Sequence, residues 1–251
     1  MSYALVAGRR AAVTPACHNS SMSTLVDANQ TARDFVASPD TLDGRVILIT
    51  GAGSGIGKAV ALAAAAAGAA VILSGRSVRR LEETYAAITA GGKIATIAPL
   101  DLEKANAPAY DELAGAIETR WGRLDGLVHN AALLGQLAPL AHYDMATWCK
   151  VLHVNVTAEF ALTQTLLPLL EKSTDASIIF TSSSVGRRGK AYWGAYAVSK
   201  FATEGMMQVL ADELSNGPVR VNAINPGKAR TAMRRAEIGR ASCRERVSPR
   251  V

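Results

Sequence analysis

The stretch that decides the fold is Val46-Ile-Leu-Ile-Thr50, which runs directly into Gly51-Ala-Gly-Ser-Gly55-Ile-Gly57. A short apolar run that ends at glycines is typical of a strand buried on both faces of a parallel sheet. The Ala-rich residues 56–68 then predict a helix, with Gly68 as its C-terminal cap. Such a turn lets the backbone approach a pyrophosphate above a helix N-terminus, so it predicts a nucleotide-binding site.

The same alternation of strand and helix continues along the chain. Apolar runs predict strands at 70–74, 94–99, 126–129, 177–181 and 219–224. Helices are predicted at 78–90, 105–121, 195–215 and, as one long helical region, 144–172. In the first of these, Leu81, Tyr85 and Ile88 form the expected buried stripe. Strands alternating with helices indicate an α/β fold with a doubly wound, Rossmann-like parallel sheet and right-handed crossovers. We see no repeat and no second domain.

Composition excludes several other classes of protein. The 251 residues suffice for one domain with a substantial core, and no apolar run reaches the length of a membrane span. Three cysteines and four histidines show no disulfide or metal spacing, so we expect no metal and a reducing, cytoplasmic location. The net charge of +6 lies entirely in residues 228–251, which hold eight Lys/Arg against two Glu. A balanced body with a basic end does not predict a nucleic-acid partner.

Both ends of the chain lack clear periodicity. We interpret residues 1–40 as a disordered or over-extended segment, with Met22 as an alternative start. A transit peptide is the other interpretation, because the first 26 residues contain Arg9 and Arg10 and no acid. Residues 41–236 are predicted to be the dinucleotide-binding catalytic domain.

The C-terminal segment 237–251 is predicted to be a non-native tail. Glu237-Ile-Gly-Arg-Ala-Ser-Cys-Arg-Glu-Arg-Val247 is also a possible translation of a common sequencing-adapter read. A basic natural tail is the alternative. On the first interpretation the domain is truncated after its sixth strand, and we expect the 251-residue chain to be poorly soluble and nearly inactive.

The spacing of glycines and the end of the second strand bear on the cofactor. The strict G-x-G-x-x-G fingerprint would need glycine at position 56, where Ile56 stands, so the turn has glycines at 51, 55 and 57 instead. The second strand ends Leu73-Ser-Gly-Arg76 without the acid that usually holds the ribose 2′-hydroxyl of NAD. Arg76 could pair with a 2′-phosphate, which favours NADP, although it could also be an ordinary surface arginine.

A candidate reactive centre lies in the second half of the chain. Tyr196 and Lys200 stand at i and i+4 on one helical face. A free tyrosine has a pKa of roughly 10, and a nearby ammonium lowers it toward the range useful for proton transfer. Ser183 follows the fifth strand, and Asn155 interrupts an apolar helical segment where a buried amide would need partners. A chance Tyr-x-x-x-Lys pair on the surface is the alternative when the motif stands alone.

In this order and spacing, the glycine turn, Asn130-Ala131, Asn155, Ser183, Tyr196, Lys200 and Asn225-Pro-Gly227 resemble the single-domain short-chain dehydrogenase/reductase family. The resemblance covers residues 45 to about 233. Leu124-Asp-Gly-Leu-Val-His-Asn-Ala, Ser182-Ser-Ser-Val-Gly-Arg and Trp193-Gly-Ala-Tyr-Ala-Val-Ser-Lys look like the bacterial YciK-type oxidoreductases in particular.

The resemblance implies a role for each matched residue. Tyr196 would be the general acid/base, Ser183 would hydrogen-bond the reacting oxygen, and Lys200 would lower the tyrosine pKa and hold the nicotinamide ribose. Asn155 would hold a water that links Lys200 to solvent. The residues implied in binding the cofactor are Gly51, Ser54, Gly55, Ile56, Gly57, Arg76, Asp101, Asn130, Ala131, Tyr196, Lys200, Pro226, Gly227 and Thr231.

The activity implied is hydride transfer between NADP(H), or less readily NAD(H), and a carbonyl or alcohol substrate, in a homodimer or homotetramer. Two departures from the family pattern are Ala132, where glycine is usual, and Lys228, where small residues are common. A non-catalytic NADP-binding sensor and a sugar-nucleotide epimerase or dehydratase remain as alternatives. The substrate itself cannot be predicted from these residues.

Overall fold

The computed structural model describes residues 38–227, 229, 231–233 and 235. The predicted tail 237–251, Lys228, and all but residues 38–40 of the predicted N-terminal segment lie outside this range. Within it, no helix is both long enough and apolar enough to cross a bilayer.

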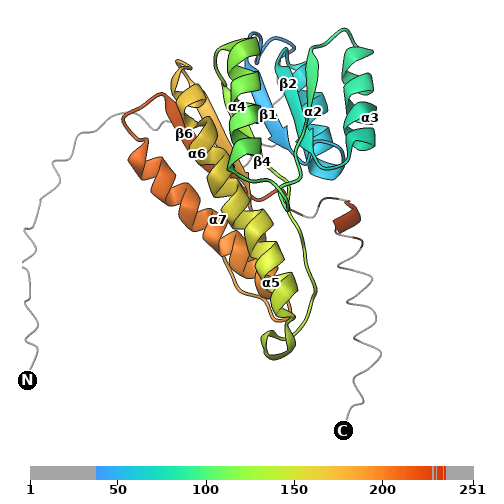
Figure 1. Cartoon of the computed structure of the whole chain (residues 1–251), viewed down its shortest axis with the longest axis vertical. Coiled ribbons are helices and arrows are strands. Elements are labelled where there is room, and N and C mark those ends of the chain that lie inside the picture. The colour runs from blue at the N-terminus through green and yellow to red at the C-terminus, as the bar shows by residue number, and fades with distance from the viewer. Residues whose placement is uncertain (1–37, 228, 230, 234, 236–251) are drawn as a thin grey trace, which may run out of the picture. The chain divides into compact units, whose positions relative to one another are not determined.

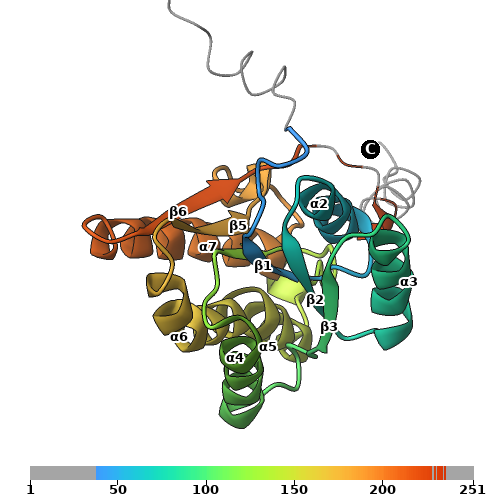
Figure 2. The same ribbon diagram turned by 90° about the horizontal axis from the view of Figure 1, so that it is seen from above.

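Six parallel strands form one sheet in the order β3-β2-β1-β4-β5-β6 (Figures 1 and 2). They are β1 (Val46–Thr50), β2 (Ala70–Gly75), β3 (Ala95–Pro99), β4 (Gly126–His129), β5 (Ala176–Thr181) and β6 (Val219–Ile224). The chain moves outward from β1 to β3 and then returns to the other side of β1 to begin β4. This reversal makes the sheet doubly wound and confirms the predicted fold class.

Helices cover both faces of the sheet (Figure 2). They are α2 (Gly55–Ala66), α3 (Val78–Thr89), α4 (Ala107–Trp121), α5 (Met145–Leu152), α6 (Ala158–Glu171) and α7 (Gly194–Glu213). Because successive side chains of a strand point to opposite faces, Leu48 packs into the cluster formed with α4, α6 and α7. Its neighbour Ile49 packs instead against α2 and α3. Burial of both faces accounts for the apolar composition of β1 and β2.

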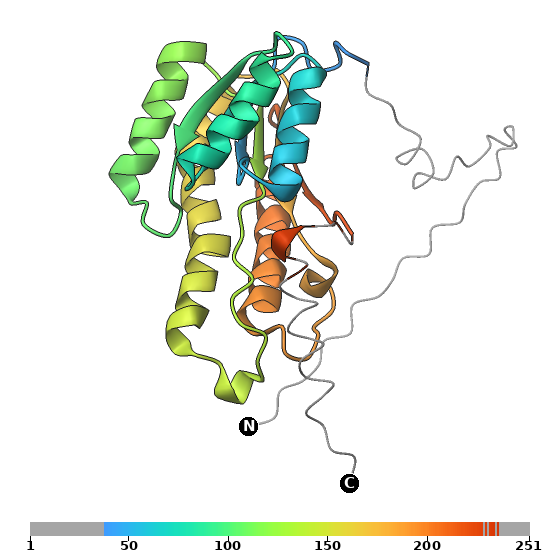
Figure 3. The ribbon, with the colours of Figure 1, turned by 90° about the vertical axis from the view of Figure 1, so that its right-hand side faces the viewer.

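The predicted helical region 144–172 is not one regular α-helix. A π-helical segment, η2 (His153–Thr157), separates α5 from α6. A π-turn widens the helix locally and is frequently found at functional sites. Figures 1 and 3 show this long helix lying alongside α7, so η2 faces the helix that carries Tyr196 and Lys200.

The predicted buried stripe of α3 is wrong at one position. Tyr85 is 39% exposed, and Thr84 is fully buried in its place. The Thr84 hydroxyl lies 3.1 Å from the carbonyl oxygen of Ala52 in the glycine turn. A polar side chain is therefore buried because it has a hydrogen-bond partner, which a count of apolar residues does not detect.

Candidate active site

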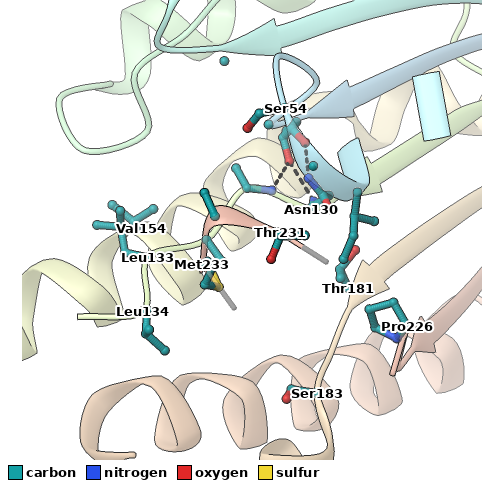
Figure 4. A pocket seen from close by; sticks show the side chains of 18 of the residues that line it. Ser54, Asn130, Leu133, Leu134, Val154, Thr181, Ser183, Pro226, Thr231 and Met233 are labelled. Atoms are coloured by element: carbon teal, nitrogen blue, oxygen red, sulfur yellow. Dashed lines mark hydrogen bonds between the residues drawn. The ribbon is translucent and has the colours of Figure 1, made fainter. Parts of the chain in front are cut away.

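A cavity of about 970 Å³ lies where the strands of the sheet end at their carboxyl termini. This is the position at which doubly wound sheets bind ligands, next to the reversal between β1 and β4. Figure 4 shows Ser54, Asn130 and Thr231 on one side of it, Ser183 beside α7, and Leu133, Leu134 and Met233 on another side. One end is thus formed by the glycine turn and another by apolar side chains.

The glycine turn packs too tightly to accept side chains. Gly51 has a φ of +68°, and a Cβ placed there would lie 2.9 Å from Nδ2 of Asn130 and 3.1 Å from Cα of Ala131. A Cβ on Gly57 would run into the carbonyl of Gly51 and the Asn130 amide. Gly57 is therefore buried beneath the turn and brings α2 against it, while Gly51 lines the cavity. The N-terminus of α2 is left facing the cavity, where it can bind phosphate.

Asn130 and Thr50 join the ends of β4 and β1. The Thr50 hydroxyl accepts hydrogen bonds from the backbone N–H groups of Asn130 (2.9 Å) and Ala131 (3.0 Å). In return, the Asn130 side-chain amide donates to the Thr50 carbonyl at 3.1 Å. These bonds hold the glycine turn beside the end of β4. Asn130 and Ala131 therefore form part of the cavity wall and do not project into the cavity.

Two arginines line the cavity beyond the end of β2. Arg76 was expected there, whereas Arg80, one turn into α3, was not. Neither guanidinium forms an ion pair within the described part of the chain, although neighbouring Arg79 pairs with Glu83. No sequence signal singled out Arg80, because Arg76 precedes the first residue of α3 and helical i, i+4 spacing does not relate the two side chains. Together the two arginines provide unpaired positive charge suited to a phosphate group.

Ser183, Tyr196 and Lys200 line the same cavity. Ser183 directly follows β5, and its hydroxyl oxygen accepts a long hydrogen bond of 3.5 Å from the Val185 N–H. Tyr196 is only 8% exposed and packs against Trp193, with ring centroids 5.8 Å apart. Lys200 is 1% exposed and lies one turn further along α7. A hydroxyl, a phenol and an ammonium thus converge on one space, which is a donor set able to hold an oxygen and exchange its proton.

Asn155 lies behind this centre and does not line the cavity. Its side chain is fully buried in η2 and exchanges two hydrogen bonds with the backbone of Leu133, at 2.8 and 2.9 Å. It also donates to the Ser199 hydroxyl of α7 at 3.0 Å. The partners expected for a buried amide are therefore the loop after β4 and the helix that carries Tyr196 and Lys200. Asn155 fixes the positions of both relative to η2.

A second buried group behind Lys200 was not foreseen from the sequence. The Glu159 carboxylate of α6 lies 3.7 Å from the Lys200 ammonium, and both side chains are 1% exposed. Burial raises the pKa of Glu159 to about 7, although Lys200 and Thr203 partly oppose that shift. Burial, together with the charge of Lys200, lowers the pKa of His129 to about 3. One acid in an apolar helix gives no sequence signal, because acids in helices are usually exposed.

Most predicted site residues meet at the cavity, and Gly57 and Asn155 lie behind its lining. Asp101 also lines it, directly after the end of β3. Of the two aromatic residues that precede Tyr196, Trp193 lines the cavity, whereas Tyr192 is 52% exposed. Lining residues that the sequence did not single out as site residues include Arg80, Glu103, Leu133, Leu134, Lys190 and Met233. The described residues contain no group of three or more His, Cys, Asp or Glu able to hold a metal.

The cavity fits a nicotinamide dinucleotide by its chemistry. A glycine turn that a Cβ would obstruct, two arginines without ion pairs and a buried Lys200 ammonium correspond to pyrophosphate, phosphate and ribose groups. A doubly wound sheet with these groups beside a Ser-Tyr-Lys centre defines a Rossmann-like oxidoreductase. The family model for short chain dehydrogenases matches residues 45–240, so the chain belongs to the short-chain dehydrogenase/reductase family.

Individual relatives agree with the subgroup inferred from the motifs. The oxidoreductase YciK of Escherichia coli is 51% identical over 196 residues, covering 78% of this chain and 77% of that protein. A short chain dehydrogenase from Pseudomonas syringae is 55% identical with a TM-score of 0.80, over 81% of this chain and 85% of the other. One from Shigella flexneri, solved in complex with NADP, is 49% identical with a TM-score of 0.79, over 80% and 84%. The predicted resemblance is therefore confirmed.

Proposed function

We propose that this oxidoreductase transfers a hydride between NADP(H) and a carbonyl or alcohol substrate, with Tyr196 as general acid/base. The observation that carries the proposal is that Ser183, Tyr196 and Lys200 line the same cavity as the glycine turn. A bound nicotinamide would supply or accept the hydride. The residues of the chain then hold the reacting oxygen and move its proton.

Each residue of the centre has a distinct role in this reaction. Ser183 donates a hydrogen bond to the substrate oxygen, and Tyr196 gives that oxygen a proton in the reductive direction or removes it in the oxidative one. The Lys200 ammonium stabilises the phenolate that remains and holds the ribose hydroxyls. Asn155 holds η2 and α7 together, and its backbone can retain the water that links Lys200 to solvent.

The choice of NADP rests on charge. Arg76 and Arg80 line the cavity without ion pairs among the described residues, and Arg76 follows β2 where NAD-selecting enzymes usually carry an acid. The relative from Shigella flexneri was solved with NADP, and one from Escherichia coli with NADPH. The phosphate-bearing cofactor is thus favoured for this chain too.

The end of the cavity beside Tyr196 favours a largely apolar substrate. Leu134, Val185, Trp193 and Met233 line it, and the Lys190 ammonium lies 5.3 Å from the Trp193 ring centroid. The family acts on small molecules, and an apolar surface of this kind binds them by excluding water. We also propose a cytoplasmic location, on the low cysteine content.

A homodimer or homotetramer is the assembly we propose. Phe160 on α6 is 52% exposed, and Phe201 and Val209 on α7 are 44% and 56% exposed. Exposed large apolar side chains on helices are a common component of protein interfaces. Light scattering after gel filtration tests this, and a monomer at micromolar concentration would contradict it.

The decisive experiment follows NADPH oxidation with a panel of ketones, aldehydes and quinones. It uses the 251-residue chain. NADPH binding together with turnover of a carbonyl supports the proposal. Binding without any turnover would favour a cofactor-binding sensor, and turnover of nucleotide sugars without net oxidation would favour an epimerase or dehydratase.

A further inference from the structure

Glu159 is a buried carboxylate that the proposed reaction does not use. It projects from α6, and its Oε1 lies 3.7 Å from Nζ of Lys200. Neither of these two atoms has a hydrogen-bond partner among the described residues. The two charges therefore attract each other across a distance slightly too long for a hydrogen bond, while Lys200 also lines the cavity.

The groups around Glu159 leave Lys200 as its cationic partner in the described part of the chain. From α7, the Thr203 hydroxyl donates to the other carboxylate oxygen, Oε2, at 3.0 Å. From β4, His129 Nε2 lies 2.8 Å from the Thr163 hydroxyl, which itself donates to the Glu159 carbonyl. His129 must then carry its proton on Nε2. Glu204, a buried acid on α7, forms an ion pair with Arg187.

Burial shifts the pKa of Glu159 and the pKa of His129 in different ways. The pKa of His129 is lowered to about 3 by burial and by Lys200, so the ring stays neutral. Burial raises the pKa of Glu159 to about 7, which places its ionisation within the range where enzymes of this kind operate. When Glu159 is a neutral carboxylic acid, it does not attract the Lys200 ammonium. When Glu159 is ionised, its carboxylate attracts that ammonium.

We propose that Glu159 is a positioning residue for Lys200: as a carboxylate it draws the ammonium toward α6, and as a carboxylic acid it leaves the ammonium to the cavity. The inference rests on the proposed function, because the ribose and Tyr196 are what need Lys200 at the cavity. Ionised Glu159 competes with both. Cofactor affinity should therefore fall as the pH rises through about 7.

The test compares the unaltered chain with Glu159→Gln, which imitates the protonated acid at every pH. NADPH affinity is measured by fluorescence at pH 6 and pH 8.5. The Gln variant should bind like the unaltered chain at pH 6 and about fivefold or more tightly at pH 8.5. Ionisation of the cofactor phosphate affects both proteins equally and cancels in the ratio of their dissociation constants.

Two further variants separate positioning from a general charge effect. Glu171→Gln makes the same change at the exposed end of α6 and should leave the ratio near one at both pH values. In a Lys200→Met background, Glu159→Gln should no longer change NADPH affinity, because the group on which Glu159 acts is missing. A ratio that is the same at both pH values, persists without Lys200, or shows weaker binding by the Gln variant throughout would overturn the inference.

Thermal unfolding without cofactor gives an independent measurement. The folded-state pKa of Glu159 lies above its ordinary 4.5, so its contribution to stability is present below that value and lost as pH rises through about 7. Glu159→Gln does not titrate, and it should gain stability relative to the unaltered chain between pH 6 and pH 8.5. If NADPH binds no variant, the proposed function fails. If it binds all of them with an unchanged ratio, only this inference fails.

Discussion

Arg76 is the residue on which cofactor choice should depend. Arg76→Ala should weaken NADPH binding by about 1.5–3 kcal/mol and leave NADH binding nearly unchanged, because only NADPH carries the phosphate it would pair with. Titration calorimetry with both cofactors measures the difference. Arg79→Ala is the matched control, since Arg79 pairs with Glu83 and does not line the cavity. An equal loss for both cofactors would contradict the assignment.

Arg80 belongs to the same prediction and shows what the sequence could not resolve. Its place at the cavity depends on how α3 packs against the glycine turn, where a Cβ on Gly53 would lie 2.9 Å from Cβ of Arg80. Arg76 could be predicted because it directly follows a strand. Arg80 and Glu159 could not, because nothing in a sequence shows which face of a helix turns toward a site when that face also carries charge.

Tyr196→Phe should lower turnover by on the order of 10²–10⁴-fold, the usual contribution of a general acid or base. NADPH binding should be retained, because the phenol acts on substrate and not on phosphate. Lys200→Ala should harm both, since Lys200 serves phenolate and ribose together. Steady-state kinetics and NADPH fluorescence on the same preparations measure the two effects. Substantial turnover by the Phe variant would mean that another group transfers the proton.

At the scale of single elements, the start of α2 depends on Gly57. Gly57→Ala should reduce the free energy of unfolding by about 1–3 kcal/mol, because its Cβ would strike the Gly51 carbonyl and the Asn130 amide. NADPH binding should fall with it as the turn is displaced. Gly205→Ala is the control on α7, where a Cβ meets nothing within 4 Å and should stabilise by about 0.4–1 kcal/mol. Urea unfolding measures both, and a neutral Gly57→Ala would refute the packing described.

The elements differ in how well the sequence predicts them. β1, β4 and β6 match their predicted bounds. β1 and β4 are buried and read as short apolar runs, whereas β6 alternates apolar residues with exposed Arg220 and Asn222 and is delimited by Pro218. The π-helical segment η2 was not predicted. One extra residue in a helix that is apolar on several sides does not visibly change the spacing of its apolar residues. Asn155 was singled out within that segment by its polarity, and its partners could be found only from the packing of α7 and the loop after β4.

For the whole molecule, Asp125 ties three segments together. Its carboxylate accepts hydrogen bonds from the Val46 N–H at 2.8 Å and the Ser173 hydroxyl at 2.7 Å, and it pairs with Arg123 at 2.9 Å. Burial alone would raise the pKa of Asp125, but these three partners outweigh it and hold the pKa below 3.8. The stability that results is present above 3.8 and is lost as the pH falls through the lowered value.

Asp125→Asn should therefore destabilise the protein by about 1–3 kcal/mol at pH 7. The difference from the unaltered protein should shrink only as the pH falls below 3.8, because there the carboxylate becomes protonated first in the unfolded chain and then, at its lowered pKa, in the folded protein. Guanidinium unfolding at several pH values measures it. A difference that stays constant across that range would show that shape and hydrogen bonding, and not charge, account for the contribution of Asp125.

The place of β1 at the centre of the sheet governs how this chain must fold. β1, β2 and β3 follow one another along the chain, so they can pair through short βαβ connections. The opposite edge of β1 pairs with β4, which comes much later in the chain. Val46 in β1 and Asp125 beside β4 are 79 residues apart. Closing such a long loop loses chain entropy before the contacts between the two segments form to compensate. A high contact order therefore slows folding. On a ribosome, the glycine turn would thus be synthesised while β1 still exposed an unpaired apolar edge. Ser183, Tyr196 and Lys200, the proposed reactive centre, would join it only after β4, β5 and α7 had been made.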